Sequence, residues 1–395
     1  MNYIIRLTTK GISSNFKTNI LGKVTFEPIL DQIKRKDYIL VLDEISDGLD
    51  TNDYAAIVTS QKLNSDLLSK LEVPVLHSVE HSDHFSVNDV LLLDTTGHIR
   101  TLYRPTSRFN TIFTTDRCNS YCLMCSQPPI KKDDSERIIE HLRLIDLIDP
   151  KTEQLGITGG EPTLLRDDLL KIIGKCKEIL PNTRLHMLTN GKMFYYSSFA
   201  EKLAAIGHPN LTLGIPLYSD MPTEHDYVVQ SKGAFEQTTI GYYNLARFNQ
   251  KIEIRVVLHA LTYKRLPQLA EYIYRNFPFV VHIALMGLEI MGFTRPNLKE
   301  LWIDPYDYQD ELEEAVFYLA NRGMNVSIYN HQLCVLKPSL WKWARQSISD
   351  YKNLYLDECN KCAVKEKCGG LFSSAEEVHS KHIKAFEKDP ECILV

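Results

Sequence analysis

The sequence has no long hydrophobic run, no excess of charge of one sign and no fixed-period repeat. Its apolar stretches are much shorter than the roughly 18 residues that a membrane-spanning helix needs, so we expect no membrane partner. The opening MNYIIRLTTKGISSNF lacks the apolar core and cleavage site of a secretory signal peptide. With 45 basic and 50 acidic residues the net charge is -5, which provides no electrostatic footprint for nucleic acid. We therefore expect a cytoplasmic protein with no nucleic-acid partner.

Cysteine is also absent from residues 1–107, whereas the rest of the chain carries all nine cysteines. In a reducing cytosol such cysteines are better interpreted as metal ligands than as disulfides. Two groups have ligand-like spacing, and Cys176 and Cys392 lie apart from both. Cys176 lies in a helical pattern and is expected to be a plain buried thiol.

Three regions differ in pattern. Residues 1–107 mix short β-branched runs with turn signals, and DVLLLDTTGHIRTLYRP predicts a hairpin around a Thr-Thr-Gly turn. This β-rich or α+β domain is a candidate for substrate docking through an exposed edge of that hairpin. Residues 108–300 alternate strands and helices, which favours an α/β fold with a parallel sheet curled into a partial (β/α)6 TIM-like barrel. Residues 301–395 begin with a helix and a strand and then become a cysteine-rich C-terminal domain.

The densest chemical signal is the run CNSYCLMC, which contains Cys118, Cys122 and Cys125. Three thiolates can hold three irons of a [4Fe–4S] cluster, which leaves one iron open to another ligand. A zinc site is the alternative, although zinc favours paired C-x-x-C units and a fourth ligand. The loop follows the first strand of the alternating region, and active sites of βα barrels lie at that end of the strands.

The C-terminal cysteines form a second constellation: Cys359, Cys362 and Cys368, preceded by Cys334. Four thiolates complete either a second [4Fe–4S] cluster or a closed zinc tetrahedron. Cys392 is an alternative fourth ligand in place of Cys334.

Together CNSYCLMC, the later GGEP, the βα series and the terminal C-x-x-C-x5-C-Gly-Gly resemble the radical S-adenosylmethionine (radical SAM) superfamily, with a SPASM-like or twitch-like auxiliary domain. The resemblance implies that SAM binds the open iron and that Gly159, Gly160, Glu161 and Pro162 meet its methionine end, with Glu161 opposite the amino group. Weaker implied SAM contacts are Met124, Asn190, Ser219, Arg255, and the backbone at Met286 and Gly287. His225 and Asp226 are interpreted either as part of a substrate loop or as a helix cap.

Several short segments, including MCSQPP, NHQLCVL and CGGLFSS, resemble the radical SAM maturase of the His-Xaa-Ser peptide system. That resemblance implies a precursor peptide as substrate, a reductant such as flavodoxin or ferredoxin, and a second radical SAM maturase as partner. A radical SAM enzyme acting on a small molecule, and a non-catalytic iron–sulfur sensor, remain alternatives. Peptide binding and SAM cleavage, respectively, distinguish them from a peptide maturase.

Overall fold

The structure, a computed structural model, describes residues 7–46 and 49–389. The chain divides into two units: unit 1 comprises residues 1–112, 135–156 and 174–183, and unit 2 comprises 113–134, 157–173 and 184–395. The alternating region is therefore shared between the units, and the strands β9 (Thr111–Phe113) and β10 (Gln154–Thr158) and the helix α4 (Asp167–Ile179) cross the division.

Unit 1 is built on an eight-stranded sheet of order β1-β8-β7-β3-β4-β5-β6-β2. Its elements are β1 (Thr8–Lys10), β2 (Ile12–Ser14), β3 (Ile20–Thr25), β4 (Tyr38–Leu42), β5 (Ala56–Thr59), β6 (Val75–His77), β7 (Val90–Leu93), β8 (His98–Tyr103), α1 (Gln32–Arg35), α2 (Ser65–Ser69) and α3 (Arg137–Leu147). Only Gly11 separates β1, which pairs with β8, from β2, which pairs with β6. One continuous segment therefore joins both ends of the sheet and closes it.

The predicted hairpin is present as the antiparallel pair β7 and β8, with Gly97 in the turn at a φ of 90°. The expectation that this hairpin offers an exposed strand edge is wrong. β7 also pairs with β3, and β8 also pairs with β1, so in the described part of the chain both strands already have two neighbours. A substrate-docking role for this region stays a prediction, but strand addition at the hairpin is not available for it.

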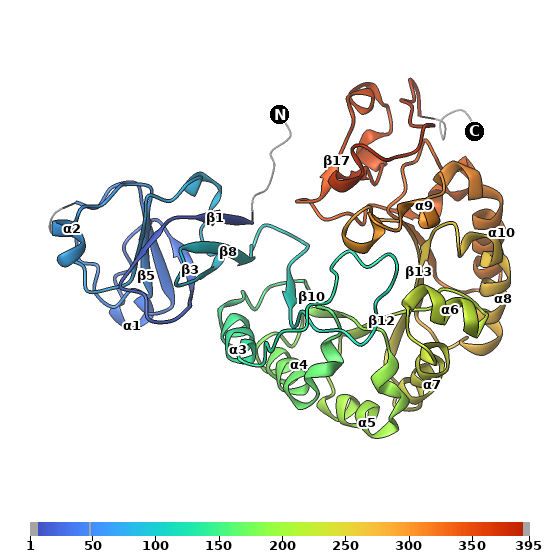
Figure 1. The fold of residues 1–395 in the computed structure, drawn as a ribbon, viewed down its shortest axis with the longest axis horizontal. Helices are drawn as coiled ribbons and strands as arrows, with labels where there is room; N and C mark the ends of the chain where they lie inside the picture. The colour runs from blue at the N-terminus through green and yellow to red at the C-terminus, as the bar shows by residue number, and fades with distance from the viewer. Residues whose placement is uncertain (1–6, 47–48, 390–395) are drawn as a thin grey trace. The chain divides into compact units, whose positions relative to one another are not determined.

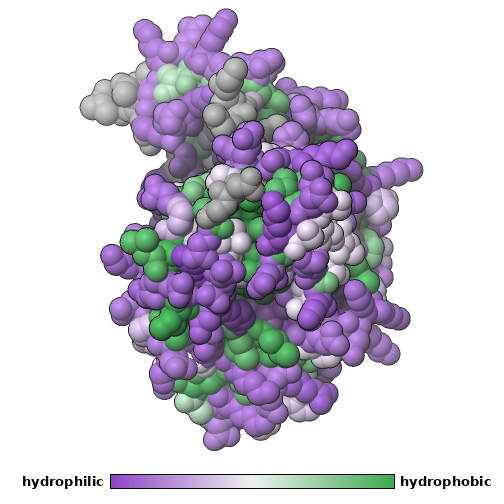
Figure 2. Space-filling view, turned by 90° about the vertical axis from the view of Figure 1, so that its left-hand side faces the viewer, coloured by the Kyte–Doolittle hydropathy of each residue, from purple (hydrophilic) through white to green (hydrophobic). Residues whose placement is uncertain are grey.

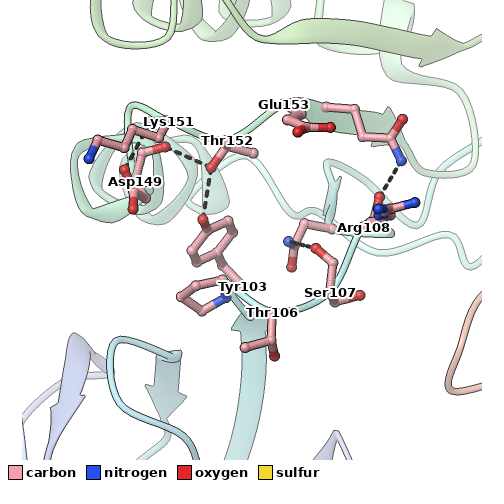
Figure 3. Close-up of a pocket in the computed structure, with 11 residues that line it drawn as sticks. Tyr103, Thr106, Ser107, Arg108, Asp149, Lys151, Thr152 and Glu153 are labelled. Atoms are coloured by element: carbon pink, nitrogen blue, oxygen red, sulfur yellow. Dashed lines mark hydrogen bonds between the residues drawn. The ribbon is translucent and has the colours of Figure 1, made fainter.

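Unit 1 also contains a polar pocket between the chain that follows β8 and the loop before β10 (Figure 3). The hydroxyls of Tyr103 and Thr152 lie 2.7 Å apart and share a hydrogen bond. The Gln154 side-chain amide donates to the Arg108 carbonyl, and the Thr152 hydroxyl donates to the Asp149 carbonyl. These groups satisfy one another and fix the chain entering β9 against the chain entering β10.

The second sheet has the order β16-β15-β14-β13-β12-β11-β10-β9, so each strand lies beside the next in the sequence. Its remaining strands are β11 (Arg184–Leu188), β12 (Leu211–Pro216), β13 (Lys251–Leu258), β14 (His282–Gly287), β15 (Val326–Tyr329) and β16 (Ala344–Arg345), and all pairs from β11 to β16 are parallel. The expected α/β architecture with a parallel sheet is confirmed. Because β15 and β16 extend the sheet, the boundary expected at residue 300 falls before its last two strands.

Helices of unit 2 lie between these strands in the sequence. They are α5 (Ser197–Ile206), α6 (Pro222–Val229), α7 (Ala234–Arg247), α8 (Leu266–Asn276), α9 (Leu298–Leu301) and α10 (Gln309–Ala320), and a two-stranded sheet, β17 (Asn353–Leu354) with β18 (Leu371–Phe372), lies in the cysteine-rich region. The helices α5, α7, α8 and α10 run along the outside of the sheet (Figure 1). In α8 the buried residues Leu266, Leu269, Ala270 and Ile273 recur at helical spacing and form one apolar face.

Side chains that alternate along the strands place apolar residues on one face of the sheet and polar residues on the other. In β13, Ile252, Ile254 and Val256 are almost fully buried, whereas Glu253 and Arg255 point to the opposite face because successive side chains alternate. That opposite face of the sheet is therefore polar at β13. The face of the molecule in Figure 2 is mainly polar with small apolar groups, and no described helix is long and apolar enough to cross a membrane.

Candidate active site

The cysteine loop follows β9 and brings its three thiols into one desolvated region. Burial, followed by the charge of Glu161, raises the pKa of Cys118 to about 11. Burial and the charges of Cys125 and Cys118 raise the pKa of Cys122 to about 12. Burial also raises the pKa of Cys125. Thiolates at these positions would be unfavourable without a cationic partner, which is what a bound iron–sulfur cluster provides.

Asp134 fixes the chain that enters this loop. Its buried carboxylate accepts hydrogen bonds from the Thr115 hydroxyl at 2.6 Å, the Asp116 N–H at 2.8 Å and Arg117 Nε at 2.9 Å. These bonds keep the pKa of Asp134 below its ordinary value, although burial acts in the opposite direction. The three residues before Cys118 are therefore held by one ionised side chain.

The two glycines of GGEP make room for the cysteine loop itself. A Cβ on Gly160 would lie 2.3 Å from the Arg117 carbonyl oxygen, and one on Gly159 would lie 2.7 Å from that of Thr115. In this close approach the Gly160 N–H donates to the Thr115 carbonyl at 2.7 Å and the Glu161 N–H donates to that of Arg117 at 2.8 Å. Any larger residue would push the two loops apart. Pro162 then begins a short 3₁₀ helix, Pro162–Leu165.

Glu161 is fully buried, and both of its carboxylate oxygens are occupied by donors from the protein. Oε1 accepts from the Thr163 N–H at 3.0 Å and from the hydroxyls of Thr163 and Thr189 at 2.6 Å each, and Oε2 accepts from the Asn190 N–H at 2.6 Å. The side chain thus joins the end of β10 to the end of β11. Its predicted contact with the SAM amino group stays a prediction.

The segment after β11 clamps the cysteine loop at Asn119. The Asn190 side-chain amide donates to Asn119 Oδ1 at 2.6 Å, and the Lys192 ammonium donates to the Asn119 carbonyl at 2.7 Å. Asn190, predicted to line the SAM pocket, is therefore engaged directly with the loop between the first two cysteines.

Ser219, His225 and Asp226 take structural positions around α6 and α7. The Ser219 hydroxyl donates to Glu224 Oε2 at 2.7 Å and accepts from the Met221 N–H at 3.1 Å. The Asp226 carboxylate accepts from the backbone N–H groups of Gly233 and Phe235 at the start of α7. His225 is buried, which lowers its pKa to about 4, and its Nδ1 accepts from the Tyr218 N–H. These contacts favour the cap interpretation of the His225-Asp226 pair.

Arg255 belongs to a charged network on the polar face of the sheet. Arg255 donates to Glu253 Oε1 at 2.6 Å, His186 Nε2 lies 3.2 Å from the same oxygen, and His282 Nδ1 lies 2.8 Å from Oε2. Gly214 allows this arrangement, because a Cβ there would lie 3.0 Å from both Arg255 Cδ and His186 Nε2. The guanidinium is thus oriented by a neighbouring carboxylate.

The apolar candidates pack within the protein. Met124 is 8% exposed and lies in an apolar cluster with Tyr218, Val228 and Leu301. Gly287 ends β14 beside the chain at Asn330, whose carbonyl oxygen a Cβ would meet at 2.5 Å.

The C-terminal cysteines converge on one pocket, which is lined by Cys334, Cys359, Cys362 and Cys368 together with Leu333, Tyr355 and Lys384. Burial raises the pKa of Cys334 to about 11 and also raises the pKa of Cys359 and of Cys368. Cys392, the alternative ligand, lies outside the described residues. Cys176 is fully buried in α4, as expected of a plain thiol.

In the described part of the chain no three His, Cys, Asp or Glu side chains are close enough to hold a single metal ion. In a multi-iron cluster each thiolate binds a different iron, so the cysteines of one group can lie farther apart than the ligands of a single ion. Sequence reasoning missed three residues that shape the first group: Asn119, Asp134 and Lys192. For Lys192 the sequence offers one signal, which is that it directly follows the Asn190-Gly191 pair after a predicted strand.

Comparisons with known proteins agree with this site. Residues 112–273 match the family model described as Radical SAM superfamily. The chain is 31% identical over 104 residues to a GTP 3',8-cyclase of Petrotoga mobilis, covering 25% of this chain and 32% of that protein. It is 31% identical over 134 residues to the Streptomyces coelicolor GTP 3',8-cyclase, covering 31% and 36%. The chain thus spans about a third of the length of these curated relatives.

Among solved structures, the chain is similar to Streptococcus suis SuiB bound to precursor peptide SuiA, with a TM-score of 0.44, 17% identity and coverage of 56% of this chain and 48% of that chain. It is also similar to anSMEcpe with bound AdoMet and Cp18Cys peptide, with a TM-score of 0.48, 13% identity and coverage of 72% and 92%.

Residues 112–273, which carry the cysteine loop, GGEP and the strands β10–β13, are thus similar to the radical SAM superfamily. That likeness implies a [4Fe–4S] cluster and SAM as cofactors. The residues present fit the cluster: three desolvated thiols lie in one loop, and each thiolate needs a cation. The finer likeness to the His-Xaa-Ser maturase is not among these matches.

Proposed function

We propose that this protein reductively cleaves SAM at a [4Fe–4S] cluster held by Cys118, Cys122 and Cys125, and that it modifies a peptide. The observation that carries the first part is the desolvated three-cysteine loop, whose backbone pairs with the GGEP turn. When bound, these cofactors supply a 5′-deoxyadenosyl radical that removes a hydrogen atom from a substrate carbon.

The residues of the chain prepare the site for this chemistry. Asp134, the GGEP glycines and the Asn190–Asn119 contact hold the backbone of the loop that carries the three thiols. Arg255 presents a guanidinium whose orientation Glu253 sets. It is the candidate for the carboxylate of SAM or of the substrate, since arginine pairs well with carboxylates.

A peptide substrate is supported by the four-cysteine pocket beyond the barrel strands and by the separate sheet of unit 1. The resemblance of MCSQPP, NHQLCVL and CGGLFSS to the His-Xaa-Ser maturase supports a His-Xaa-Ser precursor. The four cysteines of that pocket would hold an auxiliary cluster, and a cluster there would serve in electron transfer or in orienting the substrate. A flavodoxin or ferredoxin would supply the electrons, and a second radical SAM maturase would act on the same precursor.

The test is anaerobic co-expression with neighbouring short open reading frames, followed by mass spectrometry of the peptides. We expect a mass change in one peptide that disappears when Cys118, Cys122 and Cys125 are replaced by alanine. Reconstituted protein that cleaves SAM but leaves every peptide unchanged would contradict the peptide substrate and leave SAM cleavage intact.

The curated relatives give a second candidate, a small-molecule reaction, because both are GTP 3',8-cyclases and match at 31% identity. Incubation of the reduced enzyme with SAM and GTP, followed by mass spectrometry, tests it. A cyclised nucleotide would favour this candidate, and unchanged GTP beside a modified peptide would favour the first.

A further inference from the structure

Lys192 places a buried positive charge against the cysteine loop. It is the first residue of a short 3₁₀ helix, Lys192–Tyr195, that follows Gly191, and only 7% of its surface is exposed. Its ammonium donates to the Asn119 carbonyl at 2.7 Å and to the Ser231 hydroxyl at 2.9 Å. Lysine is rarely buried, because removing an ammonium from water is costly unless nearby charge compensates.

The two hydrogen-bond acceptors of Lys192 are neutral, so they do not supply that compensation. Burial lowers the pKa of Lys192, whereas the charges of Cys118, Glu161, Cys122 and Asp226 raise it. The influence is mutual, since the charge of Lys192 lowers the pKa of both Cys118 and Cys122. Glu161 is already surrounded by four donors, and Asp226 is bound by the backbone at the start of α7. Cys118 and Cys122 are each favoured as thiolates by a backbone N–H, and Lys192, which binds the carbonyl of the residue after Cys118, adds a positive charge that favours both.

We infer that Lys192 raises the reduction potential of the cluster held by Cys118, Cys122 and Cys125, because its fixed charge stabilises the reduced state more than the oxidised state. This inference rests on the proposed function. Reduction transfers one electron from an external donor of the flavodoxin or ferredoxin class to the cluster and adds one negative charge. Cluster potentials depend on net charge, hydrogen bonding and solvent exposure around the irons. A cation that is itself shielded from water acts on that added charge with little screening.

Three substitutions separate charge from packing. Lys192→Arg keeps the charge, Lys192→Gln keeps a donor without the charge, and Lys192→Met removes both. The matched control is Lys251→Met. Lys251 also donates to a backbone carbonyl, that of Pro209 at 3.0 Å. Lys251 begins β13, whereas Lys192 follows the end of β11, so the two lysines lie at opposite ends of the parallel strands.

The measurement is a redox titration of each anaerobically reconstituted protein, followed by electron paramagnetic resonance, with iron content determined on the same samples. At a fixed potential we expect the ratio of reduced to oxidised cluster to fall at least tenfold in the Gln and Met variants, which is about 59 mV for a one-electron couple. The Arg and Lys251→Met proteins should match wild type. The iron content and spectrum of the wild type test the proposed function separately.

Iron loss in the Gln and Met variants with full iron in the Arg variant would also support a charge role. Equal potentials in all variants that hold iron would overturn the inference. Loss of iron in all three Lys192 variants, including Arg, would overturn it as well, because Lys192 would then act through packing alone.

Discussion

Replacing Glu161 by glutamine should lower the stability of unit 2 even in the absence of any ligand. The carboxylate accepts four hydrogen bonds in a fully buried position, three at Oε1 and one at Oε2. Glutamine retains one oxygen, which can replace Oε1, but its amide nitrogen would face the Asn190 N–H. One charge-assisted bond, worth about 1.5–3 kcal/mol, is lost and a buried donor is left unsatisfied. We expect the free energy of unfolding to fall by about 3 kcal/mol and Tm by about 6–12 °C.

The assay is thermal unfolding of the metal-free protein, monitored by circular dichroism, with Glu201→Gln as control. Glu201 lies exposed on α5, so removing its charge should change Tm by little more than a degree. SAM affinity is then measured well below the lowered Tm. A Glu161→Gln protein that melts like wild type but binds SAM at least tenfold more weakly would refute this reasoning and would assign the carboxylate to the SAM amino group.

Three further predictions follow from the described contacts. Burial acts to raise the pKa of Glu253, but hydrogen bonds from His186 and His282 hold that pKa far below its ordinary 4.5. The ionised Glu253 therefore stabilises the fold above about pH 4.5, and this contribution is lost as the pH falls below that value. Glu253→Gln should flatten the acid limb of a plot of unfolding free energy against pH, and an unchanged limb would contradict this. Gly11→Ala should lower the free energy of unfolding of unit 1 by about 1–3 kcal/mol in urea denaturation, because the new Cβ would lie 2.6 Å from Val79 Cγ2. An unaltered midpoint would show that the segment between β1 and β2 can move to accommodate the methyl group. Cys368→Ala should halve the iron content while SAM cleavage without peptide persists, and complete iron loss would refute independent clusters.

The sequence predicted the alternating elements well where strands are apolar and helices are amphipathic. KIEIRVVL and the α8 segment are examples, because burial of one face leaves a periodic signal. The helix α6 was missed because its residues, PTEHDYVV, show little periodicity. The strand β15 was predicted but assigned to the third region, and β16 was not predicted, because the sequence around them is irregular.

Long-range contacts set the limit of sequence reasoning. Spacing alone grouped Cys118, Cys122 and Cys125, because they lie within one loop. Spacing did not show that Asp134 and Lys192 converge on that loop, or that the segment around Gly11 closes the first sheet. The resemblance implied that the GGEP glycines meet SAM, which stays a prediction, but it did not show that their Cβ positions are blocked by the protein's own backbone.

The central claim is tested most directly by iron content and SAM cleavage in one preparation. Anaerobically reconstituted wild type should carry about eight irons and, on reduction, release 5′-deoxyadenosine. The protein with Cys118, Cys122 and Cys125 replaced by alanine should keep about four irons and release none. A triple variant that still cleaves SAM, or a wild type that binds a full cluster at this loop and never cleaves SAM, would contradict the account.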